Sequence, residues 1–540
     1  MALSPKADAL RDIERSYFDL RWHMDPVAAT QAGVSAHDGR YGAFDPSSLT
    51  PQLAALKSLA LALEEAPVDS LEDEIDRTAL LNTIRLTLRV FEHERPQARH
   101  PEFWVAHLLD GLHHLVRATD RTPAARAAAL VDRLEAMPRV LDEARATLTE
   151  PVRVFAETAL SMAEAGLGLI RQVGSEVGGR AERMPSAVDA ATAALGAFIH
   201  DLERWTETGV EAYALGEDGF NFRLHYEHAL RDTAPELWRY GHRLKEELQA
   251  DLAERAKGLG ASRREAWPEV VDRLRAVHST AEDLVASYAA EMRRARDFVT
   301  AKNLAAIPDA PLEVVPTPEF LRPVIPFAAY QSPGPYAGDR TGWFYVTAPD
   351  AALPAAQRER MLRDHSRHEL AITALHEGVP GHHLQLTVAQ AQESDVRKNL
   401  WTPLTVEGWA LYCEDMMGEA GFYAREEGFF QRVHLLWRAI RVLLDVGLHT
   451  RGMTIAQAVD MMVHELHFDR ANAVAEVQGY CAAPAYTLCY AVGRRELLHL
   501  REDFRAARGG EYTLRGFHDA VLPYGGLPVT LIRWGLGLGE

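Results

Sequence analysis

Helical patterns run through most of this chain of 540 residues and give way to a different pattern in one segment, about 308–349. In residues 7–23, for example, Leu10, Ile13, Tyr17 and Leu20 recur at helical spacing. Repetition of this kind predicts a mainly α-helical protein. The other helical segments predicted in this way are 50–65, 70–93, 122–150, 150–173, 186–207, 233–257, 279–302, 355–377, 402–423, 425–450, 454–467 and 484–506.

Two of these helices have recognisable first turns. Thr233-Ala-Pro-Glu236 places a Thr at the N-cap, a Pro just inside the helix and a Glu three residues after the cap, which is the pattern of a capping box. Ser279-Thr-Ala-Glu282 has the same outer residue types, so we expect a second capping box and a helix start there.

The segment 308–349 is rich in Pro and β-branched residues, and WFYVT at 343–347 is typical of a short strand. We therefore expect a small β element directly before the helix that carries the chemistry described below. An exposed edge of such a strand can pair with an extended peptide through backbone hydrogen bonds. A small structural hairpin fits the same residues equally well.

Composition and charge limit the classes of partner. The net charge of −19 argues against a nucleic-acid partner and against an anionic membrane, because both need a basic surface. No apolar run is long enough for a membrane helix, and the first residues lack the apolar core of a signal peptide. The 3 cysteines are an odd number and suggest no disulfide framework, so we expect a cytoplasmic protein.

No linker divides the chain in an obvious way. We expect one helical domain over residues 1–540, with an N-terminal helical part at 1–305 and a catalytic part at 306–540. The sequence does not determine the oligomeric state, for which a homodimer is one alternative.

The stretch ALHEGVPGHHLQ, from Ala374 to Gln385, concentrates side chains that suit a metal site. In the HExxH motif of zinc peptidases, two histidines at i and i+4 bind the metal and the Glu acts as a base. Here i+4 is Pro380, which cannot bind a metal, and the next histidines are at i+6 and i+7. His376 is expected as one ligand, with Glu377 beside it as the base for a metal-bound water.

Either His382 or His383 can supply the second ligand. On a regular helix His383 lies about 340° around from His376 but about 10 Å further along the axis, too far for a two-histidine site. His382 lies about 240° around, but Pro380 interrupts the helix and Gly381 permits a bulged or left-handed turn. Such a bulge would bring His382 to the usual i+4 position. We therefore favour His382 as the ligand and treat His383 as a neighbouring or alternative ligand.

A third ligand is expected from EGWALYCE, residues 407–414. Zinc peptidases of the glutamate type take it from a Glu on a separate downstream helix, which favours Glu407. Glu414 lies on the same helix face about two turns further on, where it can orient a ligand imidazole, and an exposed glutamate is the alternative. One zinc ion would thus have three protein ligands and a water. The phrase HELHF at 464–468 spaces its histidines at i and i+3 without an evident third ligand.

These phrases carry a resemblance to a known family. HEGVPGHHLQ followed by EGWALYCE is similar to the pattern HE-x-x-PGHH-x-Q with a later EGWALY-x-E in the bacterial family catalogued as domain of unknown function 885. NFRLHYEHAL at 221–230 and FHDAVLPYGGLP at 517–528 are similar to it as well, so the resemblance covers nearly the whole chain. It implies a helical zincin with a deep central cleft, related to the thermostable carboxypeptidase, angiotensin-converting enzyme and oligopeptidase group.

The family pattern also includes a region like RY…P-x-Q-A…Y-x-x-G, which reads QGYCAAPAYTLCYAVG here, at 478–493. Gly479 and Tyr486 stand where the family has Arg and Gln, which implies altered specificity if those two residues hold the substrate. Tyr490 matches and is a candidate donor to a developing oxyanion, with a buried structural Tyr as the alternative. Arg494 and Arg495 follow it and are available to bind the terminal carboxylate of a carboxypeptidase substrate.

The residues and the resemblance together favour a zinc-dependent hydrolase, a metallopeptidase that acts on a peptide or a small peptide-like amide substrate. Zinc is the one cofactor expected. The glycine-rich phrases do not lie between a strand and a helix, so they do not indicate a phosphate-binding site. Two alternatives remain open: a catalytically inactive zincin-like scaffold that binds a partner, and an amide hydrolase for a specialised metabolite.

Overall fold

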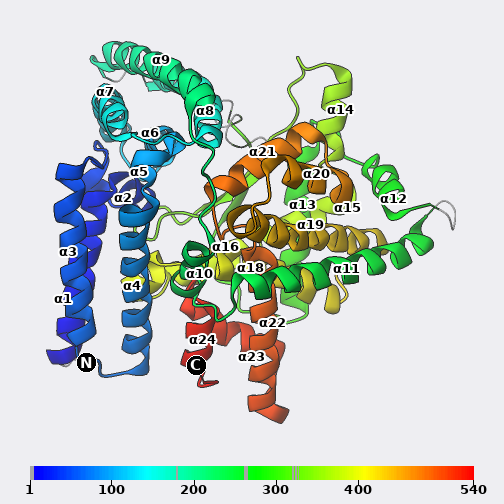
Figure 1. Ribbon diagram of the computed structural model, residues 1–540. Helices are drawn as coiled ribbons and strands as arrows, with labels where there is room; N and C mark the ends of the chain where they lie inside the picture. Colours follow the sequence, from blue (N-terminus) through cyan, green and yellow to red (C-terminus); the bar gives the residue numbers. More distant parts are fainter. Residues whose placement is uncertain are drawn as a thin grey trace. The chain divides into compact units, whose positions relative to one another are not determined.

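The computed structural model describes residues 5–177, 181–260, 265–318, 322, 325 and 327–539. Over these residues the protein is mainly helical with one small three-stranded sheet, which confirms the predicted fold class. The chain forms two compact units (Figure 1), one of Met1–Tyr213 with Pro333–Arg340 and one of Ala214–Ser332 with Thr341–Glu540. All the residues predicted for the site belong to the second unit.

The first unit is an assembly of helices. They are α1 (Pro5–Met24), α2 (Pro26–Ala32), α3 (Pro46–Glu65), α4 (Leu71–Arg89), α5 (Pro96–Arg99), α6 (Pro101–Arg117), α7 (Pro123–Thr147), α8 (Arg153–Val177) and α9 (Met184–Thr208). The α9 helix packs against both α7 and α8. In the core, the buried guanidinium of Arg133 donates to Thr30 Oγ1 at 2.7 Å and to the carbonyl oxygen of Pro26 at 3.2 Å. These bonds replace the water that a buried charge loses.

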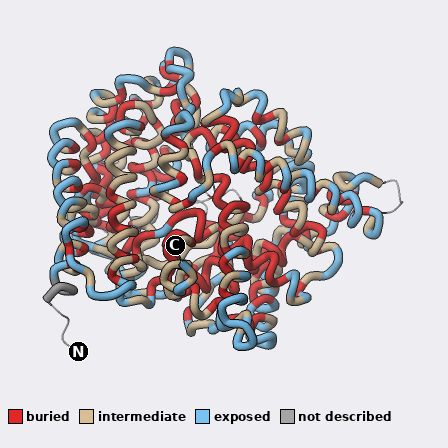
Figure 2. Tube along the Cα trace, turned by 60° about the horizontal axis from the view of Figure 1, so that its bottom comes forward, coloured by how far each residue is buried: buried red, intermediate tan, exposed pale blue. Residues whose placement is uncertain are grey.

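The second unit holds the remaining helices and the sheet. The helices are α10 (Glu217–Tyr226), α11 (Ala234–Leu259), α12 (Trp267–Arg275), α13 (Leu284–Ala301), α14 (Ala355–Arg363), α15 (Arg367–Glu377), α16 (His382–Gln390), α17 (Asp395–Asn399), α18 (Pro403–Glu419), α19 (Arg425–Thr450), α20 (Ile455–Leu466), α21 (Arg470–Ala482), α22 (Cys489–Arg508), α23 (Leu514–Val521) and α24 (Val529–Gly535). The long helices α11 and α19 lie side by side (Figure 1). Buried and exposed residues alternate along most of the helices (Figure 2), as in helices with one apolar face.

The sheet lies against the helices that lead to the predicted metal site. Its strands are β1 (Leu312–Pro316), β2 (Ala328–Gln331) and β3 (Gly342–Val346), with β3 in the centre, parallel to β1 and antiparallel to β2. Phe344 of β3 is buried in one cluster with Tyr288 of α13 and with Leu370 and Ala374 of α15. The strand predicted at 343–347 is therefore confirmed, and its apolar side chains fix the sheet on α15.

Most predicted helices are confirmed, and three details differ. The capping box of Thr233 and Glu236 is present, with Thr233 N donating to the Glu236 carboxylate at 2.8 Å. The helix start predicted at 279–282 is wrong, because Thr280 Oγ1 accepts from Asp283 N at 3.2 Å and forms a turn before α13 begins. The helix predicted at 355–377 is divided into α14 and α15. The predicted segments also omit α6 and α21 and the shorter helices α2, α5, α10, α12, α16, α17, α23 and α24.

Helices α18 and α22 cross in backbone contact. A Cβ atom at Gly493 would lie 1.9 Å from the carbonyl oxygen of Leu404, and one at Gly408 would lie 2.6 Å from the Cα atom of Gly493. Larger residues would therefore force the helices apart, because backbone atoms cannot yield as a flexible side chain can. The crossing brings the first turn of α22 close to Glu407, which directly precedes Gly408.

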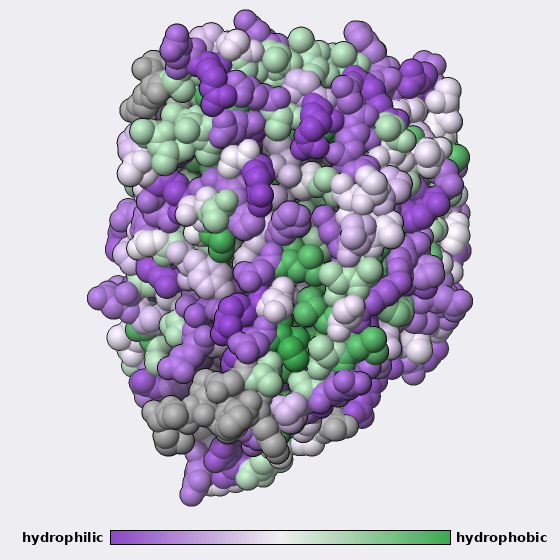
Figure 3. All heavy atoms as spheres, turned by 90° about the vertical axis from the view of Figure 1, so that its left-hand side faces the viewer, coloured by the Kyte–Doolittle hydropathy of each residue, from purple (hydrophilic) through white to green (hydrophobic). Residues whose placement is uncertain are grey.

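One face of the protein shows how hydrophilic and hydrophobic side chains are distributed on it (Figure 3). Figure 3 shows one face on which hydrophilic side chains predominate and hydrophobic ones gather in a limited area. Within the described ranges, no helix combines the length and the apolar character that crossing a membrane requires.

A buried charge cluster holds the beginning of α15. Glu369 is 4% exposed and accepts hydrogen bonds from Arg275 at 2.8 and 3.2 Å, from His434 at 3.1 Å and from Ser366 Oγ at 2.7 Å. These partners come from α12, from α19 and from the residue before α15. Because a buried carboxylate needs such partners, the cluster ties α15 to both neighbouring helices.

Replacement of Glu369 by Gln is expected to lower the free energy of unfolding by about 3 kcal/mol at neutral pH, because Arg275 would lose its buried partner. Burial alone would raise the pKa of Glu369. Arg275 and His434 lower this pKa by more than burial raises it, so that it is about 2 instead of the usual 4.5. The stabilisation is therefore complete above pH 4.5 and is lost as the pH falls toward 2. Urea unfolding of the wild type and of the Glu369→Gln variant across this pH range measures the difference in their free energies of unfolding. Glu254→Gln, at an exposed pair with Lys257, is the control, and a difference that does not shrink in acid would contradict the assignment.

Candidate metal centre

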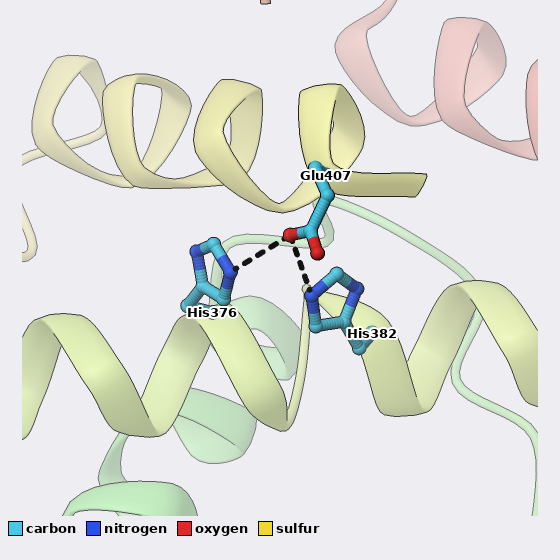
Figure 4. A group of neighbouring side chains, drawn as sticks. All are labelled: His376, His382 and Glu407. Carbon is cyan, nitrogen blue, oxygen red and sulfur yellow. Dashed lines mark ion pairs between the residues drawn. The ribbon is translucent and has the colours of Figure 1, made fainter. Parts of the chain in front are cut away.

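Three side chains from three helices converge in the second unit. His376 lies in the last turn of α15, His382 is the first residue of α16, and Glu407 lies in the first turns of α18. Figure 4 shows the two imidazoles on either side of one carboxylate oxygen, Glu407 Oε2, which lies 3.6 Å from His376 Nε2 and 3.3 Å from His382 Nε2. The three candidate ligand atoms all lie within 4.8 Å of one another.

The spacing of these atoms fits a zinc ion. Bonds of about 2.0–2.1 Å in a tetrahedral arrangement put neighbouring ligand atoms about 3.3–3.5 Å apart. The distances of 3.3 and 3.6 Å from Glu407 to the two imidazoles lie at this value. Two imidazoles and one carboxylate are also the donor set of many catalytic zinc sites, in which a water takes the fourth position. In the part of the chain that the structure describes, no other trio of His, Cys, Asp or Glu converges in this way.

The turn between α15 and α16 sets the distance between the two imidazoles. Residues 378–381 are not helical, and Gly381 N donates to the carbonyl oxygen of Leu375 at 3.0 Å. A Cβ atom at Gly381 would lie 1.8 Å from the carbonyl oxygen of His376, so only glycine fits. Its φ of −75° is not left-handed, so the expected bulge arises from close backbone approach rather than from a positive φ. His382 thereby reaches Glu407 although it stands at i+6.

His383 points to a different part of the unit. Its Nδ1 accepts from the hydroxyl of Tyr330 at 3.1 Å, and its Nε2 donates to the carbonyl oxygen of Ala310 at 3.3 Å. Gly342 makes room for this packing, because a Cβ atom there would lie 2.8 Å from the His383 ring. Both ring nitrogens are thus engaged with the sheet region. Between the two histidines that the sequence left open, His382 is the one that lies in the cluster.

Glu414 lies behind His376, as expected for a residue that orients an imidazole. His376 Nδ1 donates to Glu414 Oε1 at 2.9 Å, while His376 Nε2 faces Glu407. Burial lowers the pKa of His376, but the hydrogen bonds to Glu407 and Glu414 outweigh it and raise the pKa to about 10. Glu414 is 1% exposed, so it is not the surface glutamate of the alternative interpretation. A metal at Nε2 would replace the proton there, and the bond to Glu414 would keep the other proton on Nδ1.

Glu377 is the last residue of α15 and is only partly buried. Within the described ranges, its carboxylate makes no hydrogen bond or ion pair. Its charge still acts on its neighbours: at Tyr330, burial first and then the charge of Glu377 raise the pKa. In the described ranges, no side chain therefore holds the carboxylate of this residue, which directly follows His376 in the chain.

Tyr486 is a neighbour of the cluster that the sequence did not single out as functional. Its hydroxyl donates to Glu407 Oε1 at 3.2 Å, on the oxygen that does not face the two imidazoles. The pattern marked Tyr486 only as a departure from the family, and that departure was the available signal. Tyr486 stands where the family pattern has Gln, and this position lies beside the candidate ligand Glu407.

A buried carboxylate holds the turn at 483–488, which carries Tyr486. Asp445 of α19 accepts from Ala485 N at 3.0 Å, from Leu488 N at 3.1 Å and from Thr487 Oγ1 at 3.2 Å. Burial raises the pKa of Asp445 to about 7, although these bonds oppose the shift. Ala485 in this turn has a left-handed φ of 62°. This conformation is costly for residues other than glycine, and the contacts with Asp445 maintain it.

His228 joins this turn to the start of α18. Its Nε2 donates to the carbonyl oxygen of Ala485 at 2.9 Å, and its Nδ1 accepts from Thr402 Oγ1 at 2.6 Å. Burial lowers the pKa of His228, which favours the neutral form that can both donate and accept. Thr402 is the N-cap of α18, so one imidazole sets the helix of Glu407 against the turn of Tyr486.

Tyr490 lies beside Tyr486 and two arginines. The centroids of their rings are 6.4 Å apart, and the guanidinium carbon atoms of Arg441 and Arg438 lie 5.0 and 5.6 Å from the Tyr490 ring centroid. The role of Tyr490 as an oxyanion donor therefore stays a prediction. His467, in the phrase HELHF, has a left-handed φ of 57° at the end of α20, and neither of its histidines belongs to the converging group.

Replacement of Gly381 by Ala is expected to lower the free energy of unfolding by about 1–3 kcal/mol, because the backbone must move to accept the methyl group. The matched control is Gly196→Ala in α9, where a Cβ atom would meet nothing within 4 Å. That control should be stabilising by about 0.5–1 kcal/mol, through helix propensity. Chemical denaturation measures both. Equal effects at the two positions would contradict a steric role for Gly381.

Comparisons with known proteins identify relatives but no activity. A structure from Shewanella oneidensis, described as a candidate lipoprotein of unknown function, is 22% identical with a TM-score of 0.80, and the alignment covers 98% of this chain and 99% of that one. A structure from Colwellia psychrerythraea, described as a candidate lipoprotein, is 17% identical with a TM-score of 0.84 and 99% coverage of both chains. No curated protein matches the chain. The family described as "Bacterial protein of unknown function (DUF885)" matches residues 26–535, and the chain belongs to this family.

Proposed function

We propose that this protein is a zinc-dependent hydrolase of peptide or peptide-like amide bonds. The observation that carries the proposal is the convergence of His376, His382 and Glu407, whose candidate ligand atoms lie within 4.8 Å of one another, with Glu407 Oε2 at 3.6 and 3.3 Å from the two imidazole Nε2 atoms. A vestigial scaffold has no need to retain this geometry together with an unpaired Glu377. The sequence resemblance to helical zincins points to the same class of reaction.

His376, His382 and Glu407 would hold the ion, with Glu414 fixing His376 from behind. Zinc bound there supplies a water whose pKa is lowered to about 7 and a Lewis acid for a carbonyl oxygen. The imidazoles bind only when their Nε2 atoms are deprotonated, and the bond from His376 Nδ1 to Glu414 keeps the proton on the other nitrogen.

Glu377 is the proposed general base. It directly follows His376 in the chain, its carboxylate is partly accessible, and among the described residues it has no partner that would compete for the proton. In an amide hydrolysis it would take a proton from the attacking water and pass it to the leaving nitrogen. Tyr490, as predicted, or Tyr486, whose hydroxyl reaches Glu407, would donate to the oxyanion.

The edge of the small sheet favours the proposal of an extended peptide substrate. β2 is an outer strand and, among the described residues, pairs with β3 alone. Its Tyr330 contacts His383, the residue directly after the candidate ligand His382. A peptide added to this edge by backbone hydrogen bonds would run close to the metal centre.

We keep the expected cytoplasmic location as a proposal, and with it the absence of nucleic-acid and membrane partners. The two solved relatives are described as candidate lipoproteins, so a location at a membrane is the alternative for this chain. Fractionation of the native organism, followed by detection of the chain, separates the two.

Glu377→Gln is expected to retain one zinc ion per chain but to lose turnover by at least about 100-fold, because the amide cannot accept the proton. Elemental analysis measures the metal, and mass spectrometry of a mixed peptide pool measures cleavage with and without chelator. Glu419→Gln is the matched control, because Glu419 lies at the exposed end of α18 and pairs with Arg501. Wild-type protein purified with almost no metal would favour the scaffold alternative, and full activity of Glu377→Gln would reject the mechanism.

Glu414→Gln is expected to weaken zinc binding by about 10–100-fold, because the amide is a poorer acceptor for His376 Nδ1–H and leaves the imidazole less basic. Competition with a chromophoric chelator measures the affinity. The same control, Glu419→Gln on the same helix, should bind zinc like the wild type. Equal affinities of the Glu414 variant and the wild type would show that His376 needs no support from Glu414.

A further inference from the structure

Arg438 of α19 is a guanidinium beside the site for which the described residues supply no counter-ion. Its Nε is buried without a hydrogen-bond partner among them, and its Nη1 donates to the carbonyl oxygen of His434 at 3.5 Å. In the described ranges no carboxylate pairs with it. Burial, followed by the charge of Arg441, lowers the pKa of Arg438, whereas the nearby charges of Glu414 and Glu407 oppose this shift.

The other arginines around this position are neutralised. Arg441 pairs with Glu476 at 3.1 Å, Arg432 lies 3.5 Å from both Asp251 and Asp415, and Arg495 pairs with Asp232 at 2.6 Å. Arg494 pairs with Asp415. The two arginines that the sequence suggested for a terminal carboxylate, Arg494 and Arg495, are thus occupied by the protein's own acids.

Aromatic rings hold Arg438 in place without satisfying its hydrogen-bond donors. Its Cζ lies 4.6 Å from the Trp437 ring centroid and 5.6 Å from that of Tyr490. Such contacts orient a planar guanidinium and leave its edge available. The residue as a whole is of intermediate burial rather than fully enclosed.

A chain of contacts connects Arg438 to the metal centre. Glu407 accepts from the Tyr486 hydroxyl, the Tyr486 ring neighbours the Tyr490 ring, and Tyr490 neighbours Arg438. From the other side, His434 lies one turn before Arg438 on α19 and binds Glu369 of α15, the helix of His376. Both routes lie within the second unit, among elements packed on one another.

We propose that Arg438 binds a carboxylate of the substrate, so that the enzyme prefers substrates with a negative charge beside the bond that is cleaved. This inference rests on the proposed function and names its substrate class. A guanidinium presents two parallel donors that match the two oxygens of a carboxylate. A charge held away from water without a partner is costly, and a carboxylate would remove that cost when it binds.

The carboxylate can come from two sources: the free C-terminus of a peptide, which would make the enzyme a carboxypeptidase, or an acidic side chain. Three synthetic pools of acetylated peptides separate them. The first has free C-termini, the second has the same sequences as C-terminal amides, and the third has amidated sequences with one Gln replaced by Glu.

Cleavage of each pool by zinc-loaded wild type, Arg438→Met, Arg438→Lys and Arg432→Met is followed by mass spectrometry. The wild type is expected to prefer one acidic pool over its neutral counterpart by about 10-fold or more in kcat/KM. In Arg438→Met this ratio falls to about one, and Arg438→Lys restores part of it. Arg432→Met, on the same helix, should keep the wild-type ratio. Zinc content and thermal unfolding verify that each variant is folded.

A preference for free C-termini identifies the terminal carboxylate, and a preference for the Glu-containing pool identifies an acidic side chain. A wild-type ratio near one, or a preference that survives in Arg438→Met, overturns the proposal. If the wild type cleaves no pool, the proposed function fails separately, and the same pools are tested for binding by fluorescence anisotropy. Tighter binding of an acidic pool to the wild type than to Arg438→Met then supports the carboxylate site, and equal binding rejects it.

Discussion

The contact between Gly381 and the carbonyl oxygen of His376 is the constraint on which the candidate centre depends. A Cβ atom would lie 1.8 Å from that oxygen, so the chain can fold back after α15 only because this residue has none. The fold-back ends one helix and starts the next with His382. Two imidazoles that are six residues apart then face one carboxylate oxygen. The geometry of the candidate metal centre is therefore produced by a steric fit of the backbone.

Layers of buried polar contacts keep the three donors in register. Glu369 ties α15 to α12 and α19, Glu414 fixes the ring of His376, and His228 joins the start of α18 to the turn after α21. Burial of each of these groups costs free energy, and its hydrogen bonds offset that cost only when all of its partners are present. The same residues that stabilise the second unit thus orient the candidate ligands.

Much of the fold and of the centre could be predicted because the signals are local. Helical periodicity and capping residues gave most helices, and the HE…HH and EGWALYCE phrases gave the converging trio. The choice between His382 and His383 depended on a close backbone approach that spacing alone does not contain. Tyr486 and Arg438 could not be singled out from the sequence. Tyr486 contacts Glu407, which is 79 residues away in the chain, and Arg438 is notable only because the described residues give it no carboxylate partner. Arg494 and Arg495 were plausible until their partners were known.

Asp445 has a consequence for how such proteins diverge. It holds the turn at 483–488 through two backbone N–H groups and one Thr hydroxyl, and none of these bonds involves the side chain at position 486. The path of the main chain beside the centre is thus independent of which residue stands there. Related chains can exchange that side chain, and with it the group that contacts Glu407, without rebuilding the framework. The side chain beside the candidate centre and the architecture that holds it are separable at this point, which makes position 486 a natural place for directed evolution to begin.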